Sequence, residues 1–202
     1  LVGCGVITGV GAVLNTARIQ PGSTVAVIGC GGVGLSSVQG ALIAGAGRII
    51  AIDVVKSKLE MARQFGATDL VDASDGGVVE RVRDMTGGGV DYSFEAIGAK
   101  ETAEQAFQML GDHGTATLIG MIPQGMKIEL EGSAFLRERR IQGSVMGSNR
   151  FRIDMPRYIE YYRQGPLKLD EMISQRLHLQ GVNGAFDDMK NGNVARSVIL
   201  FD

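Results

Sequence analysis

The sequence predicts an α/β fold: a doubly wound parallel sheet of six strands in the order 3-2-1-4-5-6, followed by a small α+β segment. Short apolar runs alternate with stretches of helical periodicity. The first two runs are almost wholly apolar, which is typical of parallel strands buried on both faces. A glycine-rich turn joins the first run to the first long helix, and the alternation changes after residue 145.

A helical segment is expected over residues 2–18, where apolar residues recur at near-helical spacing before Pro21 and Gly22 end it. Strands are expected over residues 24–29, 48–53, 69–72, 90–95, 115–120 and 140–145. Helices are expected over residues 32–45, 56–65, 76–85 and 100–110. Right-handed crossovers, with a change of winding direction after the third strand, place a ligand crevice outside the carboxyl ends of strands one and four.

The part of the chain after residue 145 does not continue the strand–helix–strand alternation. Helices are expected over 155–162 and 182–189, and strands over 175–179 and 198–201. We therefore expect a second domain, with boundaries at 1–147 and 148–202. The chain begins at Leu1, inside an apolar glycine-rich segment, and is expected to be a piece of a longer protein.

Composition excludes several classes of function. With 45 % apolar and 21 % charged residues the chain has a globular composition, and its net charge of −2 gives no attraction to nucleic acid or to an anionic membrane. The basic cluster Arg137–Arg140 is interrupted by Glu138 and lacks aromatic residues, so it is interpreted as a solvated helix end rather than a polyanion site. No apolar run is long enough to span a membrane. Two cysteines outside any Cys-x-x-Cys pair favour a reducing cytoplasm.

The glycine turn in Val25–Gly34 fits G-x-G-x-x-G. Gly29 allows the tight turn, Gly31 lets the backbone approach a pyrophosphate, and Gly34 lets the helix pack closely on the sheet. The helix that begins near Gly32 directs its free N–H groups toward the phosphates.

An acid ends the next strand, nineteen positions after Gly34. This residue, Asp53, can accept hydrogen bonds from adenosine ribose hydroxyls. The sequence therefore predicts a dinucleotide-binding Rossmann fold. The alternative, a glycine-rich turn without a ligand, stays open because the chain has 30 glycines.

Six segments together resemble the zinc-type alcohol dehydrogenases of the medium-chain dehydrogenase/reductase superfamily, and the resemblance runs from end to end. These segments are Gly3–Gly9, Gly22–Gly34, Arg48–Asp53, Phe65–Thr68, Val90–Glu95 and Ala195–Leu200. The resemblance implies that 1–147 is an NAD-binding Rossmann domain. It also implies that 148–202 is the C-terminal segment of a GroES-like catalytic domain whose N-terminal part is absent here.

The resemblance implies that Cys4 is a ligand of a catalytic zinc ion, although a lone cysteine is otherwise more often a small buried hydrophobic residue. The other ligands lie upstream in that family, and His113 and His178 are interpreted as ordinary surface or loop residues. Cys30 is expected to be a small turn residue. Cys4 alone cannot hold zinc, so the chain by itself is not expected to oxidise alcohols.

The resemblance also assigns the coenzyme contacts. Asp53 and Lys58 would hold the adenosine ribose and favour NAD over NADP, because a carboxylate repels a 2′-phosphate. The other residues, with their expected contacts, are Thr8 near the nicotinamide, Gly32 and Val33 at the pyrophosphate, Ile119, Gly120 and Met121 at the carboxamide, Val145 and Met146 in the same slot, and Arg196 at the pyrophosphate. A simple alternative stays open for each residue. Thr8 could be a helix threonine without a ligand, the residues at strand ends could serve core packing, Lys58 could be a solvated lysine and Arg196 a surface arginine.

The expected function is an oxidoreductase that transfers hydride between an alcohol/aldehyde pair and NAD, with zinc as Lewis acid in the full-length protein. A non-catalytic NAD-binding remnant or interaction module is one alternative, and a zinc-free reductase of the same superfamily is another. A small-molecule substrate and a cytoplasmic homodimer or homotetramer are expected, with the alternating segment Gly125–Leu130 as a strand at the subunit edge.

Overall fold

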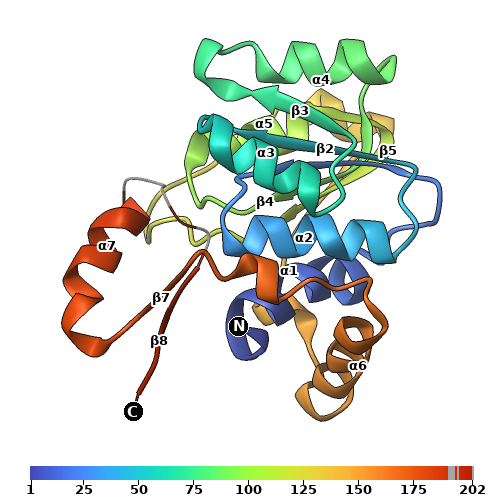
Figure 1. The fold of residues 1–202 in the computed structure, drawn as a ribbon. Coiled ribbons are helices and arrows are strands. Elements are labelled where there is room, and N and C mark those ends of the chain that lie inside the picture. The colour runs from blue at the N-terminus through green and yellow to red at the C-terminus, as the bar shows by residue number, and fades with distance from the viewer. Residues whose placement is uncertain (191–193, 195, 202) are drawn as a thin grey trace.

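A computed structural model describes residues 1–190, 194 and 196–201. Six parallel strands form one sheet in the order β3-β2-β1-β4-β5-β6 (Figure 1), which confirms the predicted topology. The strands are β1 (Thr24–Ile28), β2 (Arg48–Asp53), β3 (Asp69–Asp72), β4 (Val90–Glu95), β5 (Leu110–Leu118) and β6 (Arg140–Gly143).

Helices cover both faces of the sheet. The helices of the chain are α1 (Ile7–Gly11), α2 (Gly32–Ile43), α3 (Lys56–Gln64), α4 (Val78–Thr86), α5 (Lys100–Gln108), α6 (Phe151–Gln164) and α7 (Val182–Lys190). Of these, α7 lies away from the six-stranded sheet, beside β7 and β8 (Figure 1). Alternate residues of β1 point to opposite faces: Val25 and Val27 pack with α1, α2 and α3, whereas Ala26 and Ile28 pack with α4 and α5. This two-sided burial explains the wholly apolar strands of the sequence.

The segment before the sheet is helical over Val2–Ala17, close to the prediction, and ends where Arg18 takes a left-handed conformation with φ of 53°. Its central helix α1 lies directly on α2. A Cβ added to Gly9 would lie 2.6 Å from Cβ of Ser36 and 2.8 Å from the backbone nitrogen of Ser37. Only a glycine permits this contact, which brings the α1 segment close to the first turn of α2.

Some element bounds differ from the predictions for local reasons. Helix α4 begins at Val78 rather than at residue 76, because Gly76 and Gly77 both have positive φ. Strand β5 begins at Leu110 instead of 115, and its first half includes His113 with φ of 62° and a register irregularity against β4. The expected edge strand at 125–130 is not formed as a strand in this chain.

The C-terminal segment lies beside the main sheet (Figure 1). Strands β7 (Gln175–Leu177) and β8 (Ser197–Ile199) pair in parallel, and α7 lies between them in the chain. The sequence prediction that strand–helix–strand alternation stops after residue 145 is therefore wrong for this unit. The helix expected over 182–189 and the strands expected over 175–179 and 198–201 are all formed, although both strands are shorter than predicted. The division into two domains stays a prediction.

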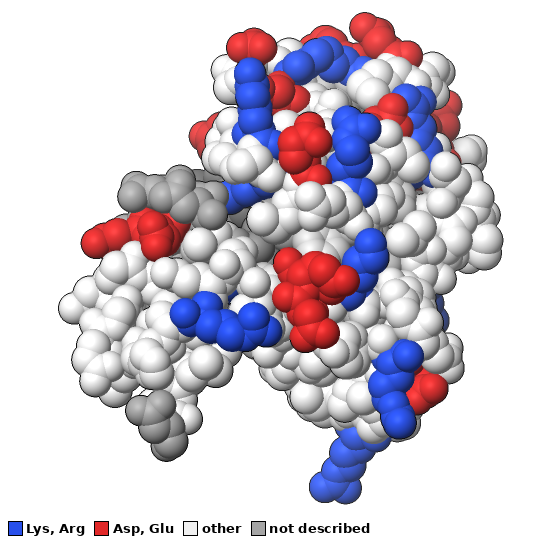
Figure 2. All heavy atoms as spheres, in the orientation of Figure 1, with Lys and Arg blue, Asp and Glu red and all other residues white. Residues whose placement is uncertain are grey.

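Within the described residues, no helix is both long enough and apolar enough to cross a membrane. On the face of the molecule in Figure 2, acidic and basic side chains are interspersed. No continuous basic surface of the kind that binds nucleic acid is visible on that face.

Candidate functional site

The carboxyl edge of the sheet borders a cleft of about 770 Å³, formed where the chain leaves β4, β5 and β6 and where α2 begins. Eight residues expected at a coenzyme or zinc site line this one cleft: Cys4, Thr8, Val33, Ile119, Gly120, Met121, Val145 and Met146. Met121 and Val145 are 91 % and 84 % exposed, which is unusual for large apolar side chains. Residues from four distant parts of the sequence thus converge at the predicted crevice.

Two glycines of the turn between β1 and α2, Gly31 and Gly34, have different steric roles. A Cβ on Gly31 would meet no atom within 4 Å, so the space outside this residue is open. A Cβ on Gly34 would instead collide with the carbonyl oxygen of Gly29 and lie 2.8 Å from its carbonyl carbon. Gly29 itself has φ of 91°, which favours glycine. The turn is therefore closed toward the protein at Gly34 and open to a ligand at Gly31.

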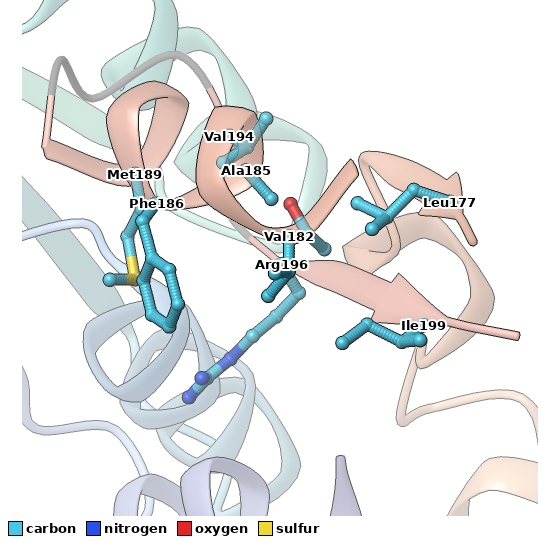
Figure 3. Close-up of a pocket in the computed structure, with 9 residues that line it drawn as sticks. Leu177, Val182, Ala185, Phe186, Met189, Val194, Arg196 and Ile199 are labelled. Atoms are coloured by element: carbon cyan, nitrogen blue, oxygen red, sulfur yellow. The ribbon is translucent and has the colours of Figure 1, made fainter. Parts of the chain in front are cut away.

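Arg196 brings a positive charge to this turn. Its side chain extends away from the apolar side chains of α7 and β8 (Figure 3). A Cβ on Gly32 would lie 2.8 Å from Cζ of Arg196, and a Cβ on Gly5 would also collide with the guanidinium. The guanidinium therefore lies against the first residue of α2, where free N–H groups and the helix dipole already favour an anion.

Asp53 lies at the end of β2 and is only 7 % exposed. Its Oδ2 accepts a hydrogen bond of 2.7 Å from the backbone N–H of Cys30, and its Oδ1 accepts one of 2.9 Å from that of Val55. Asp53 thus ties β2 to the glycine turn, a structural role that the sequence analysis missed. Each oxygen keeps a lone pair for a further donor. Lys58 is half-buried in the adjoining helix α3, near enough for its charge to act on Cys30.

Within the cleft itself, Thr8 and Met146 lie side by side, with Oγ1 of Thr8 3.8 Å from Sδ of Met146. The segment Met146–Ser148 has three consecutive positive φ angles, of 50°, 65° and 49°. The side-chain amide of Asn149 holds this segment by donating to the backbone oxygens of Met146 and, at 2.6 Å, of Ile7. Asn149 was missed, because its partner in α1 is 142 positions away in the sequence.

Glu95, at the carboxyl end of β4, was also missed, although a charged residue that ends an apolar strand was a usable signal. It is fully buried. Its Oε1 accepts hydrogen bonds from the backbone N–H groups of Ile97, at 2.9 Å, and Gly98, at 2.7 Å, and from the hydroxyl of Thr102. Its backbone oxygen accepts from the N–H of Gly120 at 3.0 Å. Glu95 therefore fixes the two loops that form one wall of the cleft.

The described residues do not by themselves fit a catalytic zinc ion. Cys4 is exposed and lines the cleft. A catalytic zinc needs three protein ligands. No group of three ligating side chains is present among the residues that the structure describes. His113 instead lies 3.1 Å from Glu138, on the other edge of the sheet.

The two cysteines are expected to differ sharply in reactivity. Cys30 is buried, and burial, followed by the charge of Asp53, raises the pKa of its thiol to about 12. Under native conditions a disulfide reagent such as Ellman's reagent is expected to modify one thiol per chain, Cys4. The Cys4→Ser variant should release no colour until denaturant is added. Fast modification of two thiols in the folded protein would contradict the burial of Cys30.

The sequence model of the zinc-binding dehydrogenase family matches residues 32–163. The chain is 41 % identical over 201 residues to the probable S-(hydroxymethyl)glutathione dehydrogenase 1 of Schizosaccharomyces pombe, with 98 % of the chain and 53 % of that protein covered. The chain thus spans about half the length of the curated relatives it matches.

Solved structures agree. Benzyl alcohol dehydrogenase from Acinetobacter calcoaceticus superposes with a TM-score of 0.96 at 31 % identity, covering 100 % of this chain and 56 % of that one. A zinc-binding dehydrogenase from Sinorhizobium meliloti, solved bound to NADP, superposes with a TM-score of 0.83 at 33 % identity, covering 90 % and 53 %. Because the family match includes more than half of the chain, this protein belongs to the zinc-binding dehydrogenase family.

Proposed function

We propose that this chain binds NAD along the carboxyl edge of its sheet and forms the coenzyme-binding part of an alcohol/aldehyde oxidoreductase. The main support is that the open glycine turn leads directly into the cleft, since Val33 in the first turn of α2 also lines the cleft. A dinucleotide needs such an arrangement: an anion site at a helix N-terminus, between a ribose site and an apolar slot.

The residues suggest one orientation for the coenzyme. The pyrophosphate lies over Gly31 and Gly32, where the helix N-terminus and Arg196 supply positive charge. The adenosine ribose lies at Asp53, beside Lys58. The pyrophosphate site and the ribose site both lie at the glycine turn, so the nicotinamide half of the coenzyme extends from the turn toward the cleft.

The nicotinamide then lies between Thr8 and Met146, and its carboxamide meets the backbone of residues 119–121. When bound, the nicotinamide supplies the hydride acceptor or donor. The residues of this chain bind and orient the ring, and the apolar side chains of the cleft exclude water from it. Cys4, in the same cleft, is proposed as one ligand of a zinc ion in the whole protein. No group of three ligating side chains lies among the described residues, so the remaining ligands are proposed to come from outside them.

The substrate class is proposed from the relatives. A benzyl alcohol dehydrogenase and an S-(hydroxymethyl)glutathione dehydrogenase both act, by their names, on hydroxyl compounds. A small alcohol or aldehyde is therefore proposed for the whole protein. A cytoplasmic homodimer or homotetramer is proposed from the family resemblance alone.

A fluorescence titration of the chain with NADH and, in parallel, NADPH tests coenzyme binding. The chain has no tryptophan, so nicotinamide emission reports binding directly. Saturable binding of NADH and much weaker binding of NADPH are expected. Asp53→Ala should weaken NADH binding about tenfold, or about 1.4 kcal/mol, and reduce the preference for NADH.

The informative quantity for Asp53→Ala is the ratio of the two affinities. Loss of the hydrogen bonds to Cys30 and Val55 would weaken NADH and NADPH alike, whereas loss of ribose recognition changes their ratio. An unchanged ratio would refute the proposed role of Asp53. Binding of neither coenzyme by the unmodified chain would refute the proposal for this chain.

A further inference from the structure

A second cavity, of about 340 Å³, lies at the opposite edge of the sheet from the coenzyme cleft. Three arginines line it: Arg83 from α4, Arg137 from the short helical segment Gly132–Arg137, and Arg139 just before β6. Apolar side chains complete the wall, among them the fully buried Phe107 of α5. The whole length of β5 separates this arginine cavity from the coenzyme cleft.

Arg139 contradicts the prediction that the basic cluster is a solvated helix end. It is only 9 % exposed, and its Nε is buried without a hydrogen-bond partner among the described residues. No ion pair joins it to a carboxylate in the described part of the chain. Burial, followed by the charges of Arg83 and Arg137, holds the pKa of its guanidinium below the usual value. Buried guanidinium groups in proteins are normally paired.

The nearby polar groups are already engaged with other partners. Arg137 forms an ion pair with Asp112, with 2.6 Å between Nε and Oδ1. Glu131, an exposed carboxylate on the rim of the cavity, accepts a hydrogen bond from the hydroxyl of Ser133. Arg83 donates to the backbone oxygen of Leu110 at 2.9 Å, which fixes its position. Three cations therefore line a cavity whose one lining carboxylate, Glu131, forms no ion pair with Arg139.

We propose that the arginine cavity is a binding site for a phosphate-type oxyanion, held mainly by Arg139. The planar guanidinium offers parallel N–H donors that match the oxygens of phosphate, and an anion in the cavity would balance the buried charge of Arg139. Arg83 and Arg137 supply further charge from two other elements. The site differs from the pyrophosphate site at the glycine turn, which lies at the other edge of the sheet and uses Arg196.

Isothermal titration of the chain with inorganic phosphate, at constant ionic strength set with chloride, tests this site. Saturable binding at one site is expected in the presence of saturating NADH, which occupies the glycine turn. Arg139→Met should weaken phosphate binding at least about tenfold, since hydrogen bonds to a charged group are lost. Arg140→Gln is the matched control, because Arg140 is the neighbouring arginine and is exposed. It should bind phosphate as the unmodified chain does.

Arg139→Lys, which keeps the charge and most of the buried stem, provides a second variant if methionine disturbs folding. It should also weaken phosphate binding, because lysine lacks Nε and the planar fork. Equal losses in Arg139→Lys and Arg140→Gln, or no phosphate binding at all, would overturn the proposal. So would loss of binding in Arg196→Gln with normal binding in Arg139→Met, since phosphate would then occupy the glycine turn. Sedimentation velocity tests one further outcome. If the unmodified chain is a dimer, if Arg139→Met makes it a monomer and if phosphate has no effect on its oligomeric state, a second copy of the chain fills the cavity and the proposal fails.

Discussion

Replacing Gly31 with valine is expected to abolish NADH binding while leaving the fold intact. A Cβ at this position meets no protein atom within 4 Å, and the backbone is extended there with φ of −77°, so valine fits the free protein. The added methyl groups would occupy the space proposed for the pyrophosphate. We expect a loss in affinity of at least about 100-fold, or about 2.7 kcal/mol, measured by NADH fluorescence titration.

The far-ultraviolet circular dichroism spectrum and the unfolding midpoint of Gly31→Val should match those of the unmodified chain. Gly31→Ala is a graded control and should show a smaller loss of affinity. Full-strength NADH binding by Gly31→Val would mean that the pyrophosphate lies elsewhere, and the proposed orientation of the coenzyme would fail with it.

The same substitution three residues later is expected to act on folding instead. In Gly34→Val the Cβ would overlap the backbone carbonyl of Gly29, so either the turn or helix α2 must move. Overpacking against a backbone atom typically destabilises by at least about 1–3 kcal/mol, and displacement of α2 from the sheet would add to this. Urea denaturation should show a lower midpoint than for Gly31→Val. Equal midpoints for the two variants would show that the α2–sheet contact tolerates a side chain.

The order of the six strands could be predicted because the first two strands of the chain, β1 and β2, are almost wholly apolar and the turn after β1 is rich in glycine. The positions that line the cleft could be predicted only through the family resemblance. Val145 and Met121, for example, are exposed apolar residues at strand ends, and nothing in their local sequence distinguishes them from core residues.

Other features depend on contacts between distant residues. The burial of Arg139 could not be predicted, since its neighbours Arg137, Glu138 and Arg140 are all exposed. It is buried where the helical segment Gly132–Arg137 packs on α5, with the rings of Phe107 and Phe135 4.9 Å apart. The roles of Asn149 and of the Asp53 carboxylate in shaping the backbone likewise depend on partners far away in the sequence.

The contact of α1 with α2 through Gly9 has a mechanical consequence. Two helices that touch through their backbones, with no flexible side chain between them, form one stiff body. Thr8 lies in α1, Cys4 lies in the helical turn Val2–Val6 that leads directly into α1, and Val33 lies in α2. If α2 tilts when a phosphate binds at its first turn, the Cys4 thiol therefore moves together with α2. The distance from the bound nucleotide to the Cys4 thiol is therefore fixed by the fold, because Gly9 has no methyl group that would separate α1 from α2.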